Sequence, residues 1–304
     1  MGGNVATGQG SDSGGYGVMR RHTHGYEFDS WTELMDVAEN GADLAPDMGR
    51  ASRNPRWDDW AGASWDGAVS MARRGWTEGA ERIARQRDAL YAHLVEIVNR
   101  KEVAYAQQGP GILNMKRYQQ GHPAPYQVRR QTTDQIDAER SRGILRIGFN
   151  MGASSAVSSE VMFVRGAAIA ALVDCLERAK FRVELDVADA ASGNEGRRLY
   201  TTYTRIKNAE DHLEPDLLAF ICAHSAALRR ISFSVWETAD PSIRRAFSFC
   251  DEGHYGTPAR AFDGREYDIV LEQAHSGDER WHSEETAAAW VRGMLAAQGI
   301  EVAE

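Results

Sequence analysis

The sequence predicts an α/β protein in which a helical N-terminal region precedes a doubly wound, mostly parallel sheet with helices on both faces. Three observations predict this class. Strand-like and helix-like segments alternate after residue 144, as in parallel sheets whose strands are joined by helices. The first three of them form a strand, helix, strand unit of about 45 residues, long enough for a crossover connection. Before residue 108 the apolar residues follow helical spacing instead.

Composition narrows the functional classes. The chain has 304 residues, 42% of them hydrophobic, which fits an ordinary globular protein with ample core. Its net charge of −9 disfavours nucleic acid or an anionic membrane as a partner unless a local basic patch exists. We expect a cytoplasmic protein, because no apolar run could span a bilayer and no signal pattern begins the chain. Three separated cysteines exclude a disulfide scaffold and a zinc ribbon.

The N-terminal part divides into a tail and a helical region. Residues 1–25 are rich in Gly, Ser and Asn and predict a disordered tail. Within the helical region, 26–107, Ser30 and Glu33 form a capping box that begins a short helix. Ser64 begins a second helix, which Gly75 ends, and Thr77 begins a longer one.

A polar linker or arm is predicted over 108–143, where Gly and Pro interrupt the helical pattern. The α/β domain then occupies 144–304. Its predicted strands are 144–149, 181–187, 198–206 and 267–271, and its predicted helices are 161–179, 217–228 and 284–297. Residues 231–236 fit either a helix or a strand, and 300–302 could add an edge strand.

The loop after the first predicted strand is the first candidate site, because ligands of open α/β sheets bind beyond the carboxyl ends of the strands. It contains Asn150, Gly152 and Ser154 at alternate positions. Oxygen-bearing side chains in such a loop can ligate Mg²⁺. The alternative is a Ser-rich loop that only begins the next helix, with Ser158 or Ser159 as the N-cap.

The spacing Asn150-x-Gly152-x-Ser154 resembles the metal-ion loop of von Willebrand factor A-like domains, whose pattern is Asp-x-Ser-x-Ser. The resemblance extends over roughly residues 144–300 and implies a sheet of that type. It also implies that a Thr and an Asp from later loops complete the Mg²⁺ site, for which Thr202 (or Thr204) and Asp278 are possible matches. Asn150 and Gly152 depart from the pattern and remove a charge and a hydroxyl, which lowers the expected affinity for metal.

Three stretches, 64–79, 165–185 and 277–299, resemble a family of uncharacterised proteins carried by bacteriophages and mobile elements. This resemblance extends over roughly residues 60–300. It implies a phage-encoded protein in the cytoplasm of a bacterial host, and it implies no mechanism.

Aromatic and basic side chains before residue 144 could contact a partner. Tryptophan is enriched at interaction hot spots, and basic residues interleaved with aromatics can hold single-stranded nucleic acid. The alternatives are core packing for the tryptophans and a solvated helix face for the arginines, since acidic residues are interspersed. The candidates are Trp57, Trp60, Trp76, Arg73, Arg74, Arg129 and Arg130.

The resulting hypothesis is a non-enzymatic binding or scaffold protein that uses the carboxyl edge of its sheet to bind a protein partner. We assign no catalytic residues, because the sequence has no complete triad, zinc signature or phosphate loop. One alternative is a metal-dependent enzyme acting on a phosphate or nucleic-acid substrate through Glu160, Asp186, Asp189 and Asp278. Another is a nucleic-acid-binding component of phage replication or packaging.

Overall fold

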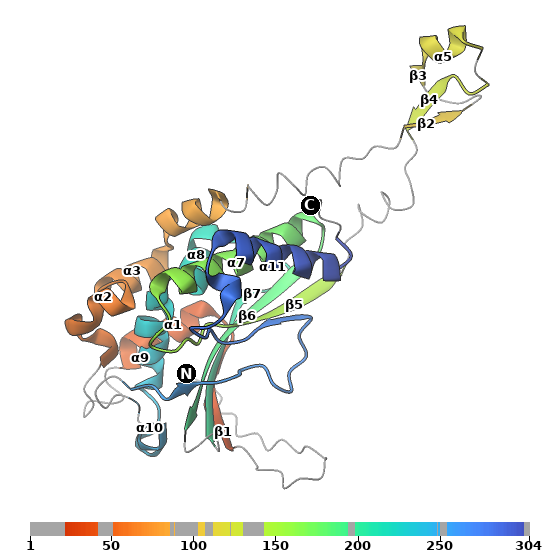
Figure 1. Ribbon diagram of the computed structural model, residues 1–304. Coiled ribbons are helices and arrows are strands. Elements are labelled where there is room, and N and C mark those ends of the chain that lie inside the picture. Colours follow the sequence, from red (N-terminus) through yellow and green to blue (C-terminus); the bar gives the residue numbers. More distant parts are fainter. Residues whose placement is uncertain are drawn as a thin grey trace.

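A central mixed sheet organises the computed structural model, which describes residues 22–41, 51–85, 88, 103–106, 112–121, 123–129, 143–193, 198–247, 249 and 254–300. The strand order is β1-β7-β6-β5-β9, and β8 pairs with β6 (Figure 1). The strands are β1 (His22–Phe28), β5 (Ile144–Asn150), β6 (Arg182–Gly193), β7 (Arg198–Lys207), β8 (Thr257–Pro258) and β9 (Ile269–Leu271).

Most strand pairs in this sheet are parallel, as predicted. Strand β5 is parallel to β6 on one side and to β9 on the other, and β1 is parallel to β7. Strands β6 and β7 are antiparallel, so the chain returns there directly instead of through a crossover helix. The molecule is therefore a mixed α/β protein whose mostly parallel sheet contains one long antiparallel pair.

The described helices of the body pack on one face of the sheet, so the prediction of helices on both faces is wrong for these residues. Leu185 and Val187 of β6 belong to the main core with the helices, whereas the alternate residues Ala188 and Ala190 pack against Phe262 in a loop. The physical reason is the β6–β7 return, which places no helix on the second face. The helices are α1 (Trp31–Asn40), α2 (Asp58–Ala61), α3 (Trp65–Arg74), α7 (Ser159–Arg178), α8 (Pro215–Ala223), α9 (Phe233–Trp236), α10 (Pro241–Phe247) and α11 (Glu284–Ala297).

Short helical turns complete the body. Three of them are 3₁₀-helices, at Ala51–Arg53, Pro55–Trp57 and Glu279–Trp281. Ala227–Ser232 is a π-helix that continues into α9, so the stretch 231–236 is helical. Ile300 lies outside any strand, and 301–302 lie outside the described residues. No helix in the described part of the chain is long and apolar enough to cross a membrane.

The N-terminal region shares the core of the α/β body. Phe28, Trp31 and Met35 are buried in the same cluster as Ile147 of β5 and Leu172 of α7. The predicted tail also ends earlier than expected, because residues 22–25 belong to β1. That strand depends on pairing with β7, and a Cβ on Gly25 would lie 1.7 Å from the carbonyl oxygen of Thr201.

Two neighbouring arginines of the π-helix attach the residues before α3 to the body. Arg230 is fully buried and donates to the carbonyl oxygens of Ser52 (2.7 Å) and Asn54 (3.1 Å) and to the Asp58 carboxylate (2.5 Å). Arg229 donates to the carbonyl oxygens of Trp60 (2.6 Å) and Val157 (2.5 Å). Because a buried charge without partners is costly, these bonds determine where 51–63 lies.

Part of the predicted linker, together with residues 103–106 of the region predicted to be helical, forms a second, smaller sheet that stands apart from the body (Figure 1). Its strands are β2 (Val103–Ala106), β3 (Ile112–Leu113) and β4 (Tyr126–Arg129), and β4 pairs antiparallel with both others. Helix α5 (Met115–Gln119) lies between β3 and β4. Pro123 and Pro125, two of the residues that suggested an irregular segment, lie between α5 and β4, and residues 109–111 lie outside the described residues.

Close packing of α7 on α8 yields a stability prediction. A Cβ on Gly166 of α7 would lie 2.0 Å from the carbonyl oxygen of Cys222, so Gly166→Ala must push the two helices apart. We expect the free energy of unfolding to fall by about 3 kcal/mol, measured by denaturant titration. Gly293→Ala on α11 is the control, because no atom lies within 4 Å of the added methyl group. It should stabilise by about 0.5–1 kcal/mol, and equal effects of both substitutions would contradict the prediction.

Candidate functional site

The loop that follows β5 borders a pocket of about 310 Å³ at the carboxyl edge of the sheet. Strand β5 lies between β6 and β9, so the strand order reverses direction at β5. Ligands of such sheets usually bind beyond the carboxyl end of the strands at this point. The loop residues 152–155 form one wall, so the loop chosen from the sequence does adjoin a cavity. The opposite wall comes from Trp60, the π-helix with α9, and residues 254–258.

Four aromatic side chains contribute to the lining of this pocket, which we call the edge pocket: Trp60, Phe233, Trp236 and Tyr255. The rings of Phe233 and Tyr255 stack with centroids 3.8 Å apart, and Trp60 stacks with Phe233 at 6.4 Å. The described lining residues include no Asp, Glu, Lys or Arg side chain. The described part of the lining is therefore uncharged and partly aromatic, which suits an apolar or aromatic group.

Polar contacts behind the edge pocket hold its aromatic walls in place. The Arg229 guanidinium lies 4.4 Å from the centre of the Trp60 ring, and the Trp60 indole N–H points to the carbonyl oxygen of Ser155 (3.5 Å). The Tyr255 hydroxyl donates to the Glu237 carboxylate (2.6 Å), which also accepts the Ser52 hydroxyl (2.6 Å). Since Arg229, Glu237 and Ser52 are buried, both rings are positioned before any ligand arrives.

Asn150 shapes the loop from within. Its side-chain oxygen accepts the N–H of Gly152 (2.9 Å), and its amide group donates to Glu272 (3.1 Å) and to the carbonyl oxygen of Ala259 (2.8 Å). Asn150 is fully buried, and a Cβ on Gly152 would lie 2.8 Å from its side-chain oxygen. The two residues that depart from the metal-loop pattern therefore fit one another as parts of a folded turn.

Arg165, which the sequence analysis did not select, joins the ends of two strands. It projects from α7, is almost completely buried, and donates to the carbonyl oxygens of Asn150 (2.7 Å), Leu271 (3.4 Å) and Glu272. Burial lowers the pKa of Arg165 to about 9. A charged residue in the middle of an otherwise apolar helix was the sequence signal for this role.

The five residues proposed for Mg²⁺ do not form one set of ligands. Asn150, Gly152 and Ser154 share the loop, but Thr202 faces the other side of the sheet and accepts the Trp236 indole N–H (3.0 Å). Asp278 lies in a neighbouring loop, paired with Arg280 and with the Trp281 indole N–H (2.8 Å). Among the described residues, no group of three or more His, Cys, Asp or Glu side chains could hold a metal ion.

The carboxylates of the enzyme hypothesis are also separated. Glu160 pairs with Arg82 at the surface, and Asp186 pairs with Arg205 on the face of β6 opposite to that of Asp189. They do not converge on the Asn150 loop as two-metal or acid-base chemistry would require.

The predicted partner-binding residues have different surroundings. Trp60 lines the edge pocket and Trp57 packs on it with ring centroids 6.2 Å apart, whereas Trp76 packs into the body against His224. Arg73 is paired with Asp36 and Glu39, and Arg74 lies exposed at the end of α3. Arg129 ends β4, and Arg130 lies outside the described residues. The described part of the chain thus forms no continuous groove of arginines and tryptophans.

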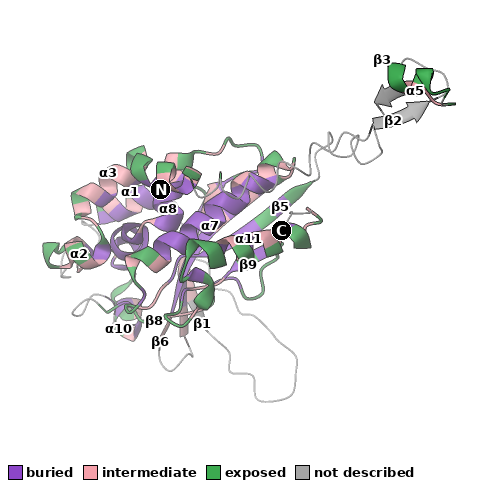
Figure 2. Ribbon diagram, turned by 45° about the horizontal axis from the view of Figure 1, so that its top comes forward, coloured by how far each residue is buried: buried purple, intermediate pink, exposed green. Residues whose placement is uncertain are grey.

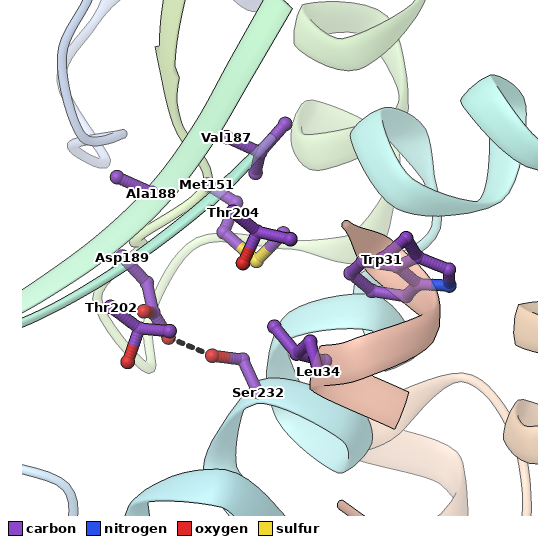
Figure 3. Close-up of a pocket in the computed structure, with 9 residues that line it drawn as sticks. All are labelled: Trp31, Leu34, Met151, Val187, Ala188, Asp189, Thr202, Thr204 and Ser232. Atoms are coloured by element: carbon purple, nitrogen blue, oxygen red, sulfur yellow. Dashed lines mark hydrogen bonds between the residues drawn. The ribbon is translucent and has the colours of Figure 1, made fainter. Parts of the chain in front are cut away.

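A buried carboxylate lies in β6, next in sequence to Ala190 of the edge pocket. Asp189 accepts the Ser232 hydroxyl and borders a cavity of about 10 Å³ with Trp31, Met151 and Thr204 (Figure 3). Such a cavity has room for about one water molecule. Burial raises the pKa of Asp189 to about 7, although the bond to Ser232 opposes that rise.

This carboxylate should make stability depend on pH. Unfolding returns the pKa of Asp189 from about 7 to its ordinary 3.8, so between these values only the folded state holds the proton. The free energy of unfolding should therefore fall as pH rises from about 4 to about 7. Asp189→Asn removes this slope, and its stability relative to the natural protein should increase with pH and level off above about 7. Urea titrations from about pH 5 to about pH 8 measure the difference, with exposed Asp59→Asn as control. Parallel pH profiles for Asp189→Asn and the natural protein would exclude this role.

A family model described as "Domain of unknown function (DUF7192)" matches residues 18–302. The match begins before β1 and ends after α11, so it includes the N-terminal helices, the small sheet and the α/β body. Neither the curated proteins nor the solved structures include a match to the chain. The chain belongs to the uncharacterised DUF7192 family.

Proposed function

We propose that this protein is a non-enzymatic binding protein whose edge pocket receives an aromatic or apolar side chain of a protein partner. The observation that carries the proposal is that the described lining at the carboxyl edge of the sheet has four aromatic rings and no charged side chain. Interaction hot spots are formed by such desolvated pockets, in which Trp and Tyr are enriched. A volume of about 310 Å³ suits one large side chain better than an extended ligand.

The chemistry of the lining favours binding over catalysis. Among the described lining residues, His254 has the one imidazole, and Ser154, Ser155 and Thr257 have hydroxyl groups. Nucleophilic catalysis needs a serine bonded to a base that a third group orients. The hydrogen bonds of the described residues contain no such chain through His254.

The resemblance to von Willebrand factor A-like domains supports a protein-binding role at this edge. Strand β5, the loop, the apolar helix α7 and strand β6 follow in the order that the resemblance implies. Asn150 stands where the metal-loop pattern has an acidic residue, and its amide group donates to Glu272. We therefore propose that the partner is held by aromatic contacts at this edge and not through a metal ion. We further propose, from the stretches 64–79, 165–185 and 277–299, that the protein is phage-encoded and meets its partner in a bacterial cytoplasm.

Selection of peptides from a displayed random library tests the pocket. Peptides that bind the natural protein should share an aromatic residue, because burial of a ring in the pocket is energetically favourable. Ser154→Trp places a ring in the pocket and should lower the affinity for a synthesised copy of a selected peptide by about tenfold or more, measured by fluorescence polarisation. Gly293→Trp adds the same ring on the open surface of α11 and should leave affinity unchanged. Failure to enrich aromatic peptides, or equal binding by both variants, would overturn the proposal.

Thermal melting with millimolar Mg²⁺, Mn²⁺ or Ca²⁺ tests a role for metal in the same loop. We expect no change in Tm, because Thr202 and Asp278 are held elsewhere and Asn150 bonds within the turn. An ion that binds the native state must raise Tm by mass action. A rise that Ser154→Ala abolishes would contradict this expectation and favour the metal-dependent alternative.

A further inference from the structure

The small sheet of β2, β3 and β4 buries none of its described side chains. Its strands are two to four residues long, and none of its described side chains, at 113–121 and 123–126, is buried (Figure 2). Short sheets need a covered apolar face, and units of this size need added support. The described side chains of the small sheet therefore offer an open surface to a partner.

Helix α5 presents apolar side chains outward from this sheet. Met115 and Tyr118 are 56% and 59% exposed, and the spacing of three residues places them on one side of the helix. The helix is held in place by Asn114, whose side chain accepts the Arg117 N–H (3.1 Å) and whose own N–H donates to Pro125 (2.9 Å). Methionine and aromatic residues presented in this way are typical of protein interfaces.

The charge of this segment is opposite to that of the rest of the chain. Residues 103–130 contain Lys116, Arg117, Arg129 and Arg130 and no acidic residue, so their formal charge is +4. Because the whole chain carries −9, the remainder carries −13. Every copy of the protein therefore offers both a basic segment and an acidic body.

We propose that the small sheet docks, through Met115, Lys116 and Tyr118, onto the acidic body of a second copy of this chain. Opposite charges steer the copies together, and burial of Met115 and Tyr118 supplies the apolar contact. In a dimer with a two-fold axis, the small sheet of each copy docks on the body of the other copy. Nucleic acid fits less well, because the body repels a polyanion and α5 exposes a single aromatic ring where stacking uses several.

Light scattering of the full chain measures the assembly. At about 50 mM salt we expect twice the monomer mass of 33.7 kDa, and at about 500 mM salt, where charges are screened, the monomer mass. Tyr118→Ser and Lys116→Glu should each give monomers at both salt concentrations. Their melting transitions should match that of the natural protein at high salt, because both side chains are exposed.

Arg245→Glu is the matched control, since it changes the net charge as Lys116→Glu does but lies exposed on α10. It should leave the low-salt dimer intact. The proposal would be overturned if the natural protein were a monomer at low salt, or if both α5 variants, Lys116→Glu and Tyr118→Ser, formed dimers. Fluorescence anisotropy of a labelled single-stranded oligonucleotide tests the nucleic-acid alternative. If the natural protein is a monomer that raises this anisotropy, and Lys116→Glu abolishes the rise, the basic segment binds nucleic acid and the proposal is overturned.

Discussion

Buried guanidinium groups that donate to backbone carbonyl oxygens hold this structure together. Arg165 joins the carboxyl ends of β5 and β9, while Arg229 and Arg230 join the π-helix to the residues before α3. Burial of a cation is costly unless hydrogen bonds offset it, so each arginine favours the one arrangement in which several carbonyl groups accept from it. Segments far apart in sequence are thereby fixed relative to one another at the edge where the pocket lies.

The edge pocket is a consequence of these bonds. Arg229 lies against the Trp60 ring and holds the carbonyl oxygen of Val157, so one side chain positions both the aromatic wall and the loop after β5. Arg229 and Arg230 are neighbours in the π-helix, and both side chains are buried. The π-helix therefore directs two adjacent arginines into the protein. Wide helical turns of this kind are frequently found at functional sites. Binding at the edge pocket would then need little rearrangement of the protein.

The antiparallel return of β7 explains the asymmetry of the body. It leaves the helices on one face of the sheet, and the other face is covered by the loop that contains Phe262, together with polar pairs such as Asp186 and Arg205. The edge pocket and the small sheet are separate surfaces of different chemistry, one uncharged and partly aromatic in its described lining, the other basic with two exposed apolar side chains. A protein that pairs with itself and also holds a partner could use both at once.

Local patterns in the sequence determined much of the fold. Apolar periodicity predicted β5, α7, β6 and α11, and the hydroxyl side chains of Ser30, Ser64 and Ser283 cap helices. The position of the candidate site followed from the same patterns, because a loop after a central strand must lie at the carboxyl edge. These features depend on residues close together in the chain.

Only the tertiary structure decided the rest, because it depends on contacts between distant residues. Strand β1 exists by pairing with β7, which lies more than 170 residues away, and no apolar pattern marks residues 22–25. Thr202 and Asn150 lie on opposite faces because of strand register, which their spacing does not reveal. The aromatic pocket likewise combines Trp60, Phe233 and Tyr255 from separate elements. Their meeting is set by which carbonyl groups satisfy the buried arginines, and that is a property of the folded chain.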